Sequence, residues 1–192
     1  MSHNRIFIPI SWLGILVSAL VIIAGGAVPA GAQPRTAPDP TITAMIAQVQ
    51  TSTLIDYVNQ LTGETPAIIG GAPYTFVTRE TGSGVPIQKA TQYAYEFMQA
   101  QNLAVTYQTW NRCGVADRNV VAEKIGTDYP TEIVLVTAHI DSTSSTAVAP
   151  GADDDASGTA GVMAIAAIMT PHQFQRTLRF VLFTGEEQGL CG

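Results

Sequence analysis

The chain has 192 residues, 46% of them hydrophobic, and a formal net charge of −6 at pH 7. This length and composition suffice for one packed domain, with or without a leader. Nucleic acid is not expected as a partner, because binding of phosphates requires clustered Lys and Arg, whereas the nine basic residues are scattered along this chain.

Residues 1–32 predict a secretory signal peptide. Arg5 is followed by no further charged residue until Arg35, and the segment from Ile6 to Ala24 is mostly apolar. Small residues then offer cleavage sites, so basic, apolar and small-residue regions come in the order of a signal peptide. We therefore expect a secreted, cell-surface or periplasmic protein. The alternative is an uncleaved membrane anchor, and membrane association is expected only in that case.

The chain contains two cysteines, Cys113 and Cys191. An exported protein meets an oxidising environment, so the two could form one disulfide. Pairing with residues outside this chain is the open alternative. Their spacing does not match a zinc site.

The first part of the chain indicates helices joined by loops. Residues 33–40 form a Pro-rich linker. Apolar residues at helical spacing then predict one helix over 41–62, or two abutting helices that break near 51–53, ending at Gly63. Residues 64–85 are rich in turn formers and predict a long loop, and residues 86–102 predict another helix.

The second part indicates strands around one buried helix. Strands are predicted over 104–110, 119–126 and 132–140, the first of them at a sheet edge and Ile133–Val136 at the centre, buried on both faces. A helix over 158–169, capped by Ser157, precedes a strand over 178–183. This order predicts an α/β fold with a mixed sheet covered on both sides.

His139 is the first candidate functional residue, because it ends a predicted strand at the edge where α/β sheets gather their ligands. Asp141 lies two residues further on and is placed to orient the imidazole from behind rather than to share its ligand. Alone, His139 is also compatible with a buried histidine that bonds to a backbone carbonyl.

Three consecutive acids, Asp153, Asp154 and Asp155, follow in a turn framed by Pro150 and Gly151. One of them could cap the next helix and another could lie in solvent. Concentrated carboxylates also favour a cation, and a carboxylate can bridge two cations through its two oxygens. The middle residue, Asp154, is expected to be the best shielded and to take this role.

A second acidic pair, Glu186 and Glu187, follows the last predicted strand. The side chains of adjacent residues diverge, so one can bind a metal while the other acts as general base on a water. The alternative is an exposed acidic pair that interacts with a helix dipole.

These motifs carry a resemblance to a known family. HIDS at 139–142, APGADDDASG at 149–158 and LRFVLFTGEEQGL at 178–190 together resemble the secreted double-zinc aminopeptidases, the leucine-type members of the zinc-exopeptidase fold. The resemblance implies a three-layer α/β/α fold with a mixed central sheet and two Zn²⁺ ions. It also implies hydrolysis of N-terminal residues from peptide or protein substrates, often large apolar ones.

The resemblance also implies a role for each site residue. His139 and Glu187 would bind the first zinc, and Asp154 would bridge both zincs. Asp141 would support His139, and Glu186 would be the general base acting on a zinc-activated water.

One part of the family pattern is missing. The family's second zinc takes a further Asp and His downstream of the Glu pair, and neither follows Glu187 here. We therefore expect residues 41–192 to be the N-terminal part of a catalytic domain, incomplete at the C-terminus, and inactive and poorly soluble alone. Alternatives are a carboxypeptidase or glutaminyl cyclase of the same fold, or a non-catalytic binding domain.

Overall fold

The computed structural model describes residues 37–192 of the chain. The predicted signal peptide and most of the predicted linker lie outside the described residues. Within residues 37–192, no helix is long and apolar enough to cross a membrane.

The described chain opens with two short helices, α1 (Pro40–Ile46) and α2 (Thr51–Thr62). The predicted helical segment is thus two helices, and the break falls at residues 47–50, slightly before the predicted place. Gly63 ends α2 with a positive φ of 81°. A side chain there would collide with the backbone carbonyl of Phe76, so this turn requires glycine.

The predicted loop over 64–85 contains a small hairpin that the sequence did not indicate. Strand β1 (Ala67–Ile69) pairs antiparallel with β2 (Ala72–Tyr74) across Gly70 and Gly71. Helix α3 (Val85–Ala100) follows, with Pro86 in its first turn. Later in the chain, helix α4 (Ser157–Met169) comes directly after a tight turn over Ala152–Ala156.

The main sheet is mixed and has the strand order β3-β4-β6-β5. Its strands are β3 (Ala104–Arg112), β4 (Val115–Lys124), β5 (Tyr129–His139) and β6 (Arg176–Phe183). The pairs β3–β4 and β4–β6 are antiparallel, and the pair β5–β6 is parallel. The predicted edge position of the first strand and the mixed α/β fold are confirmed.

Strand β5 was predicted to be central, and in the described chain it lies at an edge of the sheet. It pairs with β6 on one side only, and Val134 and Leu135 are 44% and 60% exposed. The apolar residues Ile133–Val136 do belong to a strand, and side chains on both of its faces are apolar. Whether a strand lies at the edge or at the centre depends on whether it has one or two neighbouring strands, and an apolar pattern does not reveal that number.

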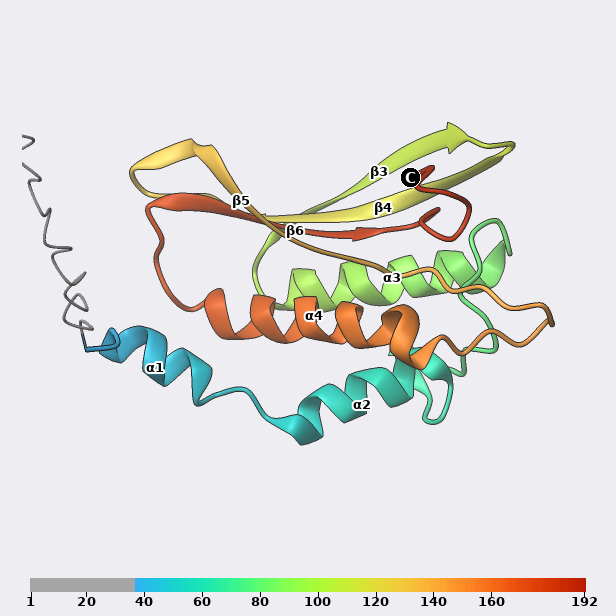
Figure 1. The fold of residues 1–192 in the computed structure, drawn as a ribbon, viewed down its shortest axis with the longest axis horizontal. Helices are drawn as coiled ribbons and strands as arrows, with labels where there is room; N and C mark the ends of the chain where they lie inside the picture. Colours follow the sequence, from blue (N-terminus) through green and yellow to red (C-terminus); the bar gives the residue numbers. More distant parts are fainter. Residues whose placement is uncertain (1–36) are drawn as a thin grey trace, which may run out of the picture. The chain divides into compact units, whose positions relative to one another are not determined.

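The helices gather on one side of this sheet (Figure 1). Helix α4 packs against β5 and β6, α3 packs against β3 and β4, and α2 packs against α4. The hydrophobic core fills this layer and includes Leu61, Ile87, Met163, Phe180 and Leu182. The second helical layer expected from the sequence is not among residues 37–192.

Because β5 and β6 are parallel, their carboxyl ends meet at the same edge. His139 lies opposite Phe183 in their register. The predicted acidic loops after each strand therefore start side by side.

Candidate metal centre

His139 is the last residue of β5, and its imidazole lies between acidic groups on both of its nitrogens. Nδ1 is 3.4 Å from Oδ1 of Asp141 and 3.2 Å from the backbone oxygen of the same residue. Nε2 is 3.0 Å from Oδ1 of Asp154. An Nδ1–H directed at Asp141 leaves the Nε2 lone pair facing the aspartate turn, which is the tautomer that a metal ligand requires.

Asp141 is completely buried. Its Oδ2 accepts hydrogen bonds from the Thr81 hydroxyl and from the backbone N–H groups of Gly185 and Glu187, at 3.0, 3.0 and 3.3 Å. Its other oxygen, Oδ1, accepts no hydrogen bond from the described part of the chain and lies 3.4 Å from His139 Nδ1. A buried carboxylate oxygen without a partner is costly. It is satisfied when His139 presents a proton to it.

The three aspartates of the turn have different environments. The Asp154 side chain is 76% exposed, so the expectation that it would be the best shielded is wrong. Asp155 is shielded instead, with a side chain only 21% exposed. Its two oxygens accept the backbone N–H groups of His139 and Gly158, at 3.2 and 2.8 Å.

Asp155 thus caps helix α4, through the Gly158 N–H, and ties the helix to the end of β5. The expected cap, Ser157, instead donates its hydroxyl to the backbone oxygen of Asp153. The sequence offered both possibilities, because an aspartate three residues before Gly158 has the same capping capacity as a serine.

Glu186 and Glu187 lie in the turn that follows β6. Backbone N–H groups of Gly189 and Leu190 close this turn onto the Glu186 carbonyl. Glu186 has a side chain that is 40% exposed, with Oε2 3.9 Å from His139 Nε2. The adjacent Glu187 joins His139 and Asp154 in a cluster whose ligand atoms all lie within 4.8 Å of one another. The predicted divergence of the two glutamates places one in the cluster and the other beside it.

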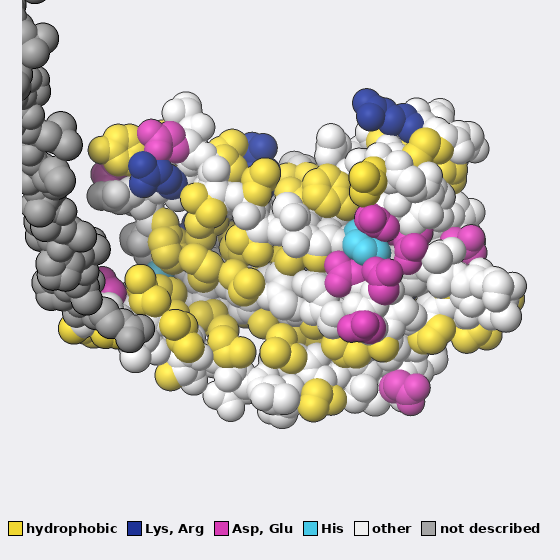
Figure 2. Space-filling model, in the orientation of Figure 1, with side chains coloured by type: hydrophobic (Ala, Val, Ile, Leu, Met, Phe, Trp, Pro, Cys, Tyr) yellow, Lys and Arg dark blue, Asp and Glu magenta, His cyan; other side chains and the backbone are white. Residues whose placement is uncertain are grey.

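The electrostatics of the cluster favour a bound cation. Burial lowers the pKa of His139, but the carboxylates of Asp141, Asp155, Glu186 and Asp154 outweigh it and raise that pKa above its ordinary value. Burial, together with Asp154 and Asp141, raises the pKa of Glu187. Figure 2 shows Asp and Glu side chains gathered around a histidine on one face of the protein. Repulsion among so many carboxylates is relieved by a positive ion.

The donor set fits zinc. One imidazole nitrogen and two carboxylate oxygens are ligands that Zn²⁺ accepts, and three protein ligands leave a position for water. The unpartnered Oδ1 of Asp141 behind His139 supplies the outer carboxylate that zinc-bound histidines commonly have. Within residues 37–192, no other group of His, Cys, Asp and Glu side chains is gathered closely enough to hold a metal ion.

A cavity of about 320 Å³ opens beside the cluster. Apolar and polar side chains from the ends of β5 and β6 line it, including Ala138, Phe183, Glu186 and Leu190. A substrate group placed there would lie next to Glu186.

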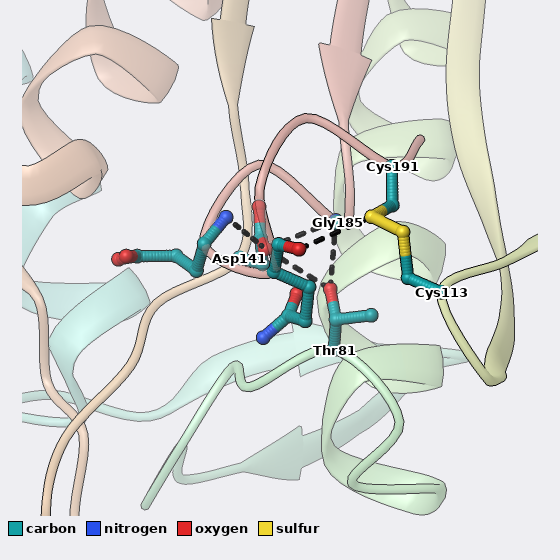
Figure 3. Close-up of a disulfide and its surroundings, with 7 residues drawn as sticks. Thr81, Cys113, Asp141, Gly185 and Cys191 are labelled. Atoms are coloured by element: carbon teal, nitrogen blue, oxygen red, sulfur yellow. Dashed lines mark hydrogen bonds between the residues drawn. A yellow bond between two sulfur atoms is a disulfide. The ribbon is translucent and has the colours of Figure 1, made fainter.

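A disulfide joins Cys113, in the turn between β3 and β4, to Cys191, just after the Glu186–Glu187 turn. Figure 3 shows it beside Gly185, close to the point where Thr81 and Asp141 meet. The Cys191 N–H also bonds to the Gly185 carbonyl at 2.8 Å. Of the two pairings left open by the sequence, the one within the chain is present.

Two residues that sequence reasoning missed contact this region. Thr81 bonds to Asp141, and the fully buried Arg79 bonds to backbone oxygens near both ends of the loop that follows β5, those of Ile140 and Pro150. Both come from the turn-rich segment 64–85, where a single Thr or Arg carries no recognisable spacing.

Comparison with known proteins agrees with this geometry. Residues 119–192 match the model of Peptidase family M28. A probable zinc metalloprotease of Pyrenophora tritici-repentis is 40% identical over 79 residues, which cover 38% of this chain and 16% of that protein. Leucine aminopeptidase 2 of Trichophyton equinum is 29% identical over 139 residues, covering 70% of this chain and 26% of that protein.

Solved structures share the fold. LapB from Legionella pneumophila superposes with a TM-score of 0.65 at 21% identity, over 80% of this chain and 40% of that one. A glutaminyl cyclase from Macrostomum lignano superposes with a TM-score of 0.59 at 16% identity, over 77% and 42%. The matched part of the chain thus covers between about a sixth and about a quarter of the length of the curated relatives named above. Residues 119–192 are similar to peptidase family M28, and the described chain shares the fold of these solved structures.

Proposed function

We propose that this chain forms the metal-binding part of a zinc-dependent aminopeptidase, which removes N-terminal residues from peptides. The observation that carries the proposal is the cluster of His139, Asp154 and Glu187, backed by the buried carboxylate of Asp141. The sequence relatives named as metalloprotease and leucine aminopeptidase support the same reaction class.

In this proposal His139, Asp154 and Glu187 would hold one zinc, and the exposed carboxylate of Asp154 would also be available to a second. A zinc bound there would lower the pKa of a water molecule and polarise a peptide carbonyl. Glu186 lies beside the cluster without belonging to it. It therefore takes a proton from the attacking water and delivers it to the leaving amine. Asp141 keeps the His139 ring in place.

We also propose that residues 1–32 direct export and are then removed. The Cys113–Cys191 disulfide supports export, because such bonds persist in oxidising compartments.

Zinc binding tests the first part of the proposal. The chain and its His139→Ala variant are titrated with zinc against a chromogenic chelator. We expect sub-micromolar affinity, and a loss of about 100-fold or more in the variant, since removing a ligand exceeds the 10–100-fold effect of losing an outer partner. Zinc affinity unchanged by His139→Ala would end the proposal.

Hydrolysis tests the second part. In a preparation of the protein that cleaves leucine p-nitroanilide, Glu186→Gln should lower kcat by about 10²–10⁴-fold, the usual contribution of a general base. Zinc affinity should change little, because Glu186 is outside the ligand cluster. Loss of zinc in parallel with activity would instead make Glu186 a ligand.

A further inference from the structure

The candidate site is built from three separate segments of the chain. They are the end of β5 with His139 and Asp141, the turn 150–155 with Asp154, and the turn 184–187 with both glutamates. None of the three is a helix or strand interior, so other contacts must hold the segments relative to one another.

Thr81 joins two of these segments through one hydroxyl. The hydroxyl donates to Oδ2 of Asp141 at 3.0 Å and accepts the backbone N–H of Gly185 at 2.8 Å. A hydroxyl has one donor and two acceptor lone pairs, so both bonds form together. Thr81 is 7% exposed, which keeps water from competing for them. Figure 3 shows the three groups meeting beside the disulfide.

Arg79 joins the same strand end to the turn 150–155. Its Nε donates to the backbone oxygen of Ile140 at 2.8 Å, between His139 and Asp141. Its two terminal nitrogens donate to the oxygens of Pro150 and Gly151 at 2.6 and 3.1 Å, shortly before Asp154.

The guanidinium of Arg79 is fully buried, and within residues 37–192 it lies in no ion pair. One more bond, to the Leu61 carbonyl at 2.6 Å, anchors it to the end of α2. Burial lowers its pKa to about 10, so it remains charged at neutral pH. A buried charge is costly unless its donors are satisfied. Here all the bonds go to backbone oxygens, and two of them hold the aspartate turn.

We propose that Arg79 and Thr81 are positioning residues that fix the three acidic segments in the geometry zinc requires. This inference rests on the zinc site proposed above. Neither residue touches the ligand atoms. Thr81 acts through Asp141 and Gly185, and Arg79 acts through the backbone on each side of the ligands.

Thr81→Val tests the inference with the least disturbance, because valine has the shape of threonine without the hydroxyl. Thr177→Val is a matched control. The Thr177 hydroxyl is also buried, accepts a glycine N–H (Gly126, 3.0 Å) and donates to an oxygen (Pro130, 2.8 Å), but at the opposite end of β6. Thr81→Ser restores the hydroxyl at the tested position.

The readouts are zinc affinity of the whole chain, the urea midpoint of the zinc-free chain, and the visible spectrum of Co²⁺ bound in place of zinc. We expect Thr81→Val to weaken zinc binding about 10-fold, the lower end of outer-partner effects. The cobalt spectrum should change, and Thr81→Ser should stay near wild type. Thr177→Val should shift the urea midpoint by a similar amount and leave zinc affinity unchanged.

Equal zinc affinities for Thr81→Val and Thr177→Val would overturn the inference, as would a serine variant as weak as the valine one. In either case, a large loss on His139→Ala would leave the proposed function standing. Arg79→Lys supplies a second comparison, because an ammonium group cannot reproduce the fork of Arg79. If Arg79→Lys does not fold, the Thr81 series decides.

Discussion

The disulfide makes a quantitative prediction about stability. Cys113 and Cys191 are 78 residues apart, so their bond closes a loop that includes most of the sheet and helix α4. In the chain-entropy description, a cross-link stabilises a protein by restricting its unfolded state. For a loop of this length it contributes about 4.5 kcal/mol at 25 °C. Typical measured values of about 2–4 kcal/mol make this an upper estimate.

The double variant Cys113→Ala/Cys191→Ala removes the bond without leaving a reactive thiol. With a urea dependence of about 2 kcal/mol per molar, the predicted loss corresponds to a midpoint about 2 M lower. The measurement is equilibrium urea unfolding of the zinc-free chain, followed by circular dichroism. The wild type in reductant serves as the control, and it should unfold at the same urea concentration as the double variant.

A midpoint difference equivalent to less than about 1 kcal/mol would refute this reasoning. It would mean that the bond does not form, or that the unfolded chain is already restricted. Sensitivity of the wild type to reductant separates these two cases. Only a formed bond can respond.

Two further predictions concern packing. Gly63→Ala should destabilise the chain by more than about 1 kcal/mol, because Gly63 has a positive φ and faces the Phe76 carbonyl. Gly161 lies within α4 and has open space around it, so Gly161→Ala should instead stabilise the chain by about 0.5–1 kcal/mol. Both changes are read from urea midpoints, and a stabilising Gly63→Ala would contradict the assigned turn. Phe180→Ala should cost about 3–5 kcal/mol, because this ring is 1% exposed on an inner strand. Ile68→Ala, at a side chain that is 63% exposed, should change stability by less than about 0.5 kcal/mol, and a comparable loss from both would argue against the core described above.

The parts of the fold that the sequence predicted are those with strong local patterns. The apolar run of α4 and the strand ending at His139 are examples, since each has the length and the composition typical of its element. The edge position of β5 could not be predicted in the same way. A run of Ile and Val looks identical with one neighbour or two, so the pattern reports suitability for burial rather than burial itself.

Some features of the candidate site could likewise be predicted from the sequence, and others could not. Residue types near strand ends pointed to His139 and Asp154, and the family resemblance implied Glu187; the structure brings ligand atoms of these three residues within 4.8 Å of one another. The shielding of the aspartates was misjudged, because it depends on which carboxylate the His139 and Gly158 N–H groups bind. Position in a run of three identical residues does not determine that choice. Arg79 was missed because its guanidinium bonds to backbone oxygens, which any residue can supply. Thr81 was missed because its partners, Asp141 and Gly185, lie 60 and 104 positions away in the chain.

The hydrogen bonds around Asp141 also determine when the site can exist. Thr81 lies 60 positions before Asp141 in the chain, and Gly185 lies 44 positions after it. Thr81 and Gly185, which also bond to each other, are 104 positions apart. No short segment contains all three partners. A peptide carrying only residues 133–158 has the imidazole and the aspartates but lacks Thr81 and Gly185, whose hydrogen bonds hold Asp141 in place. Metal affinity is therefore a property of the assembled domain, and ion binding and folding draw on the same free energy.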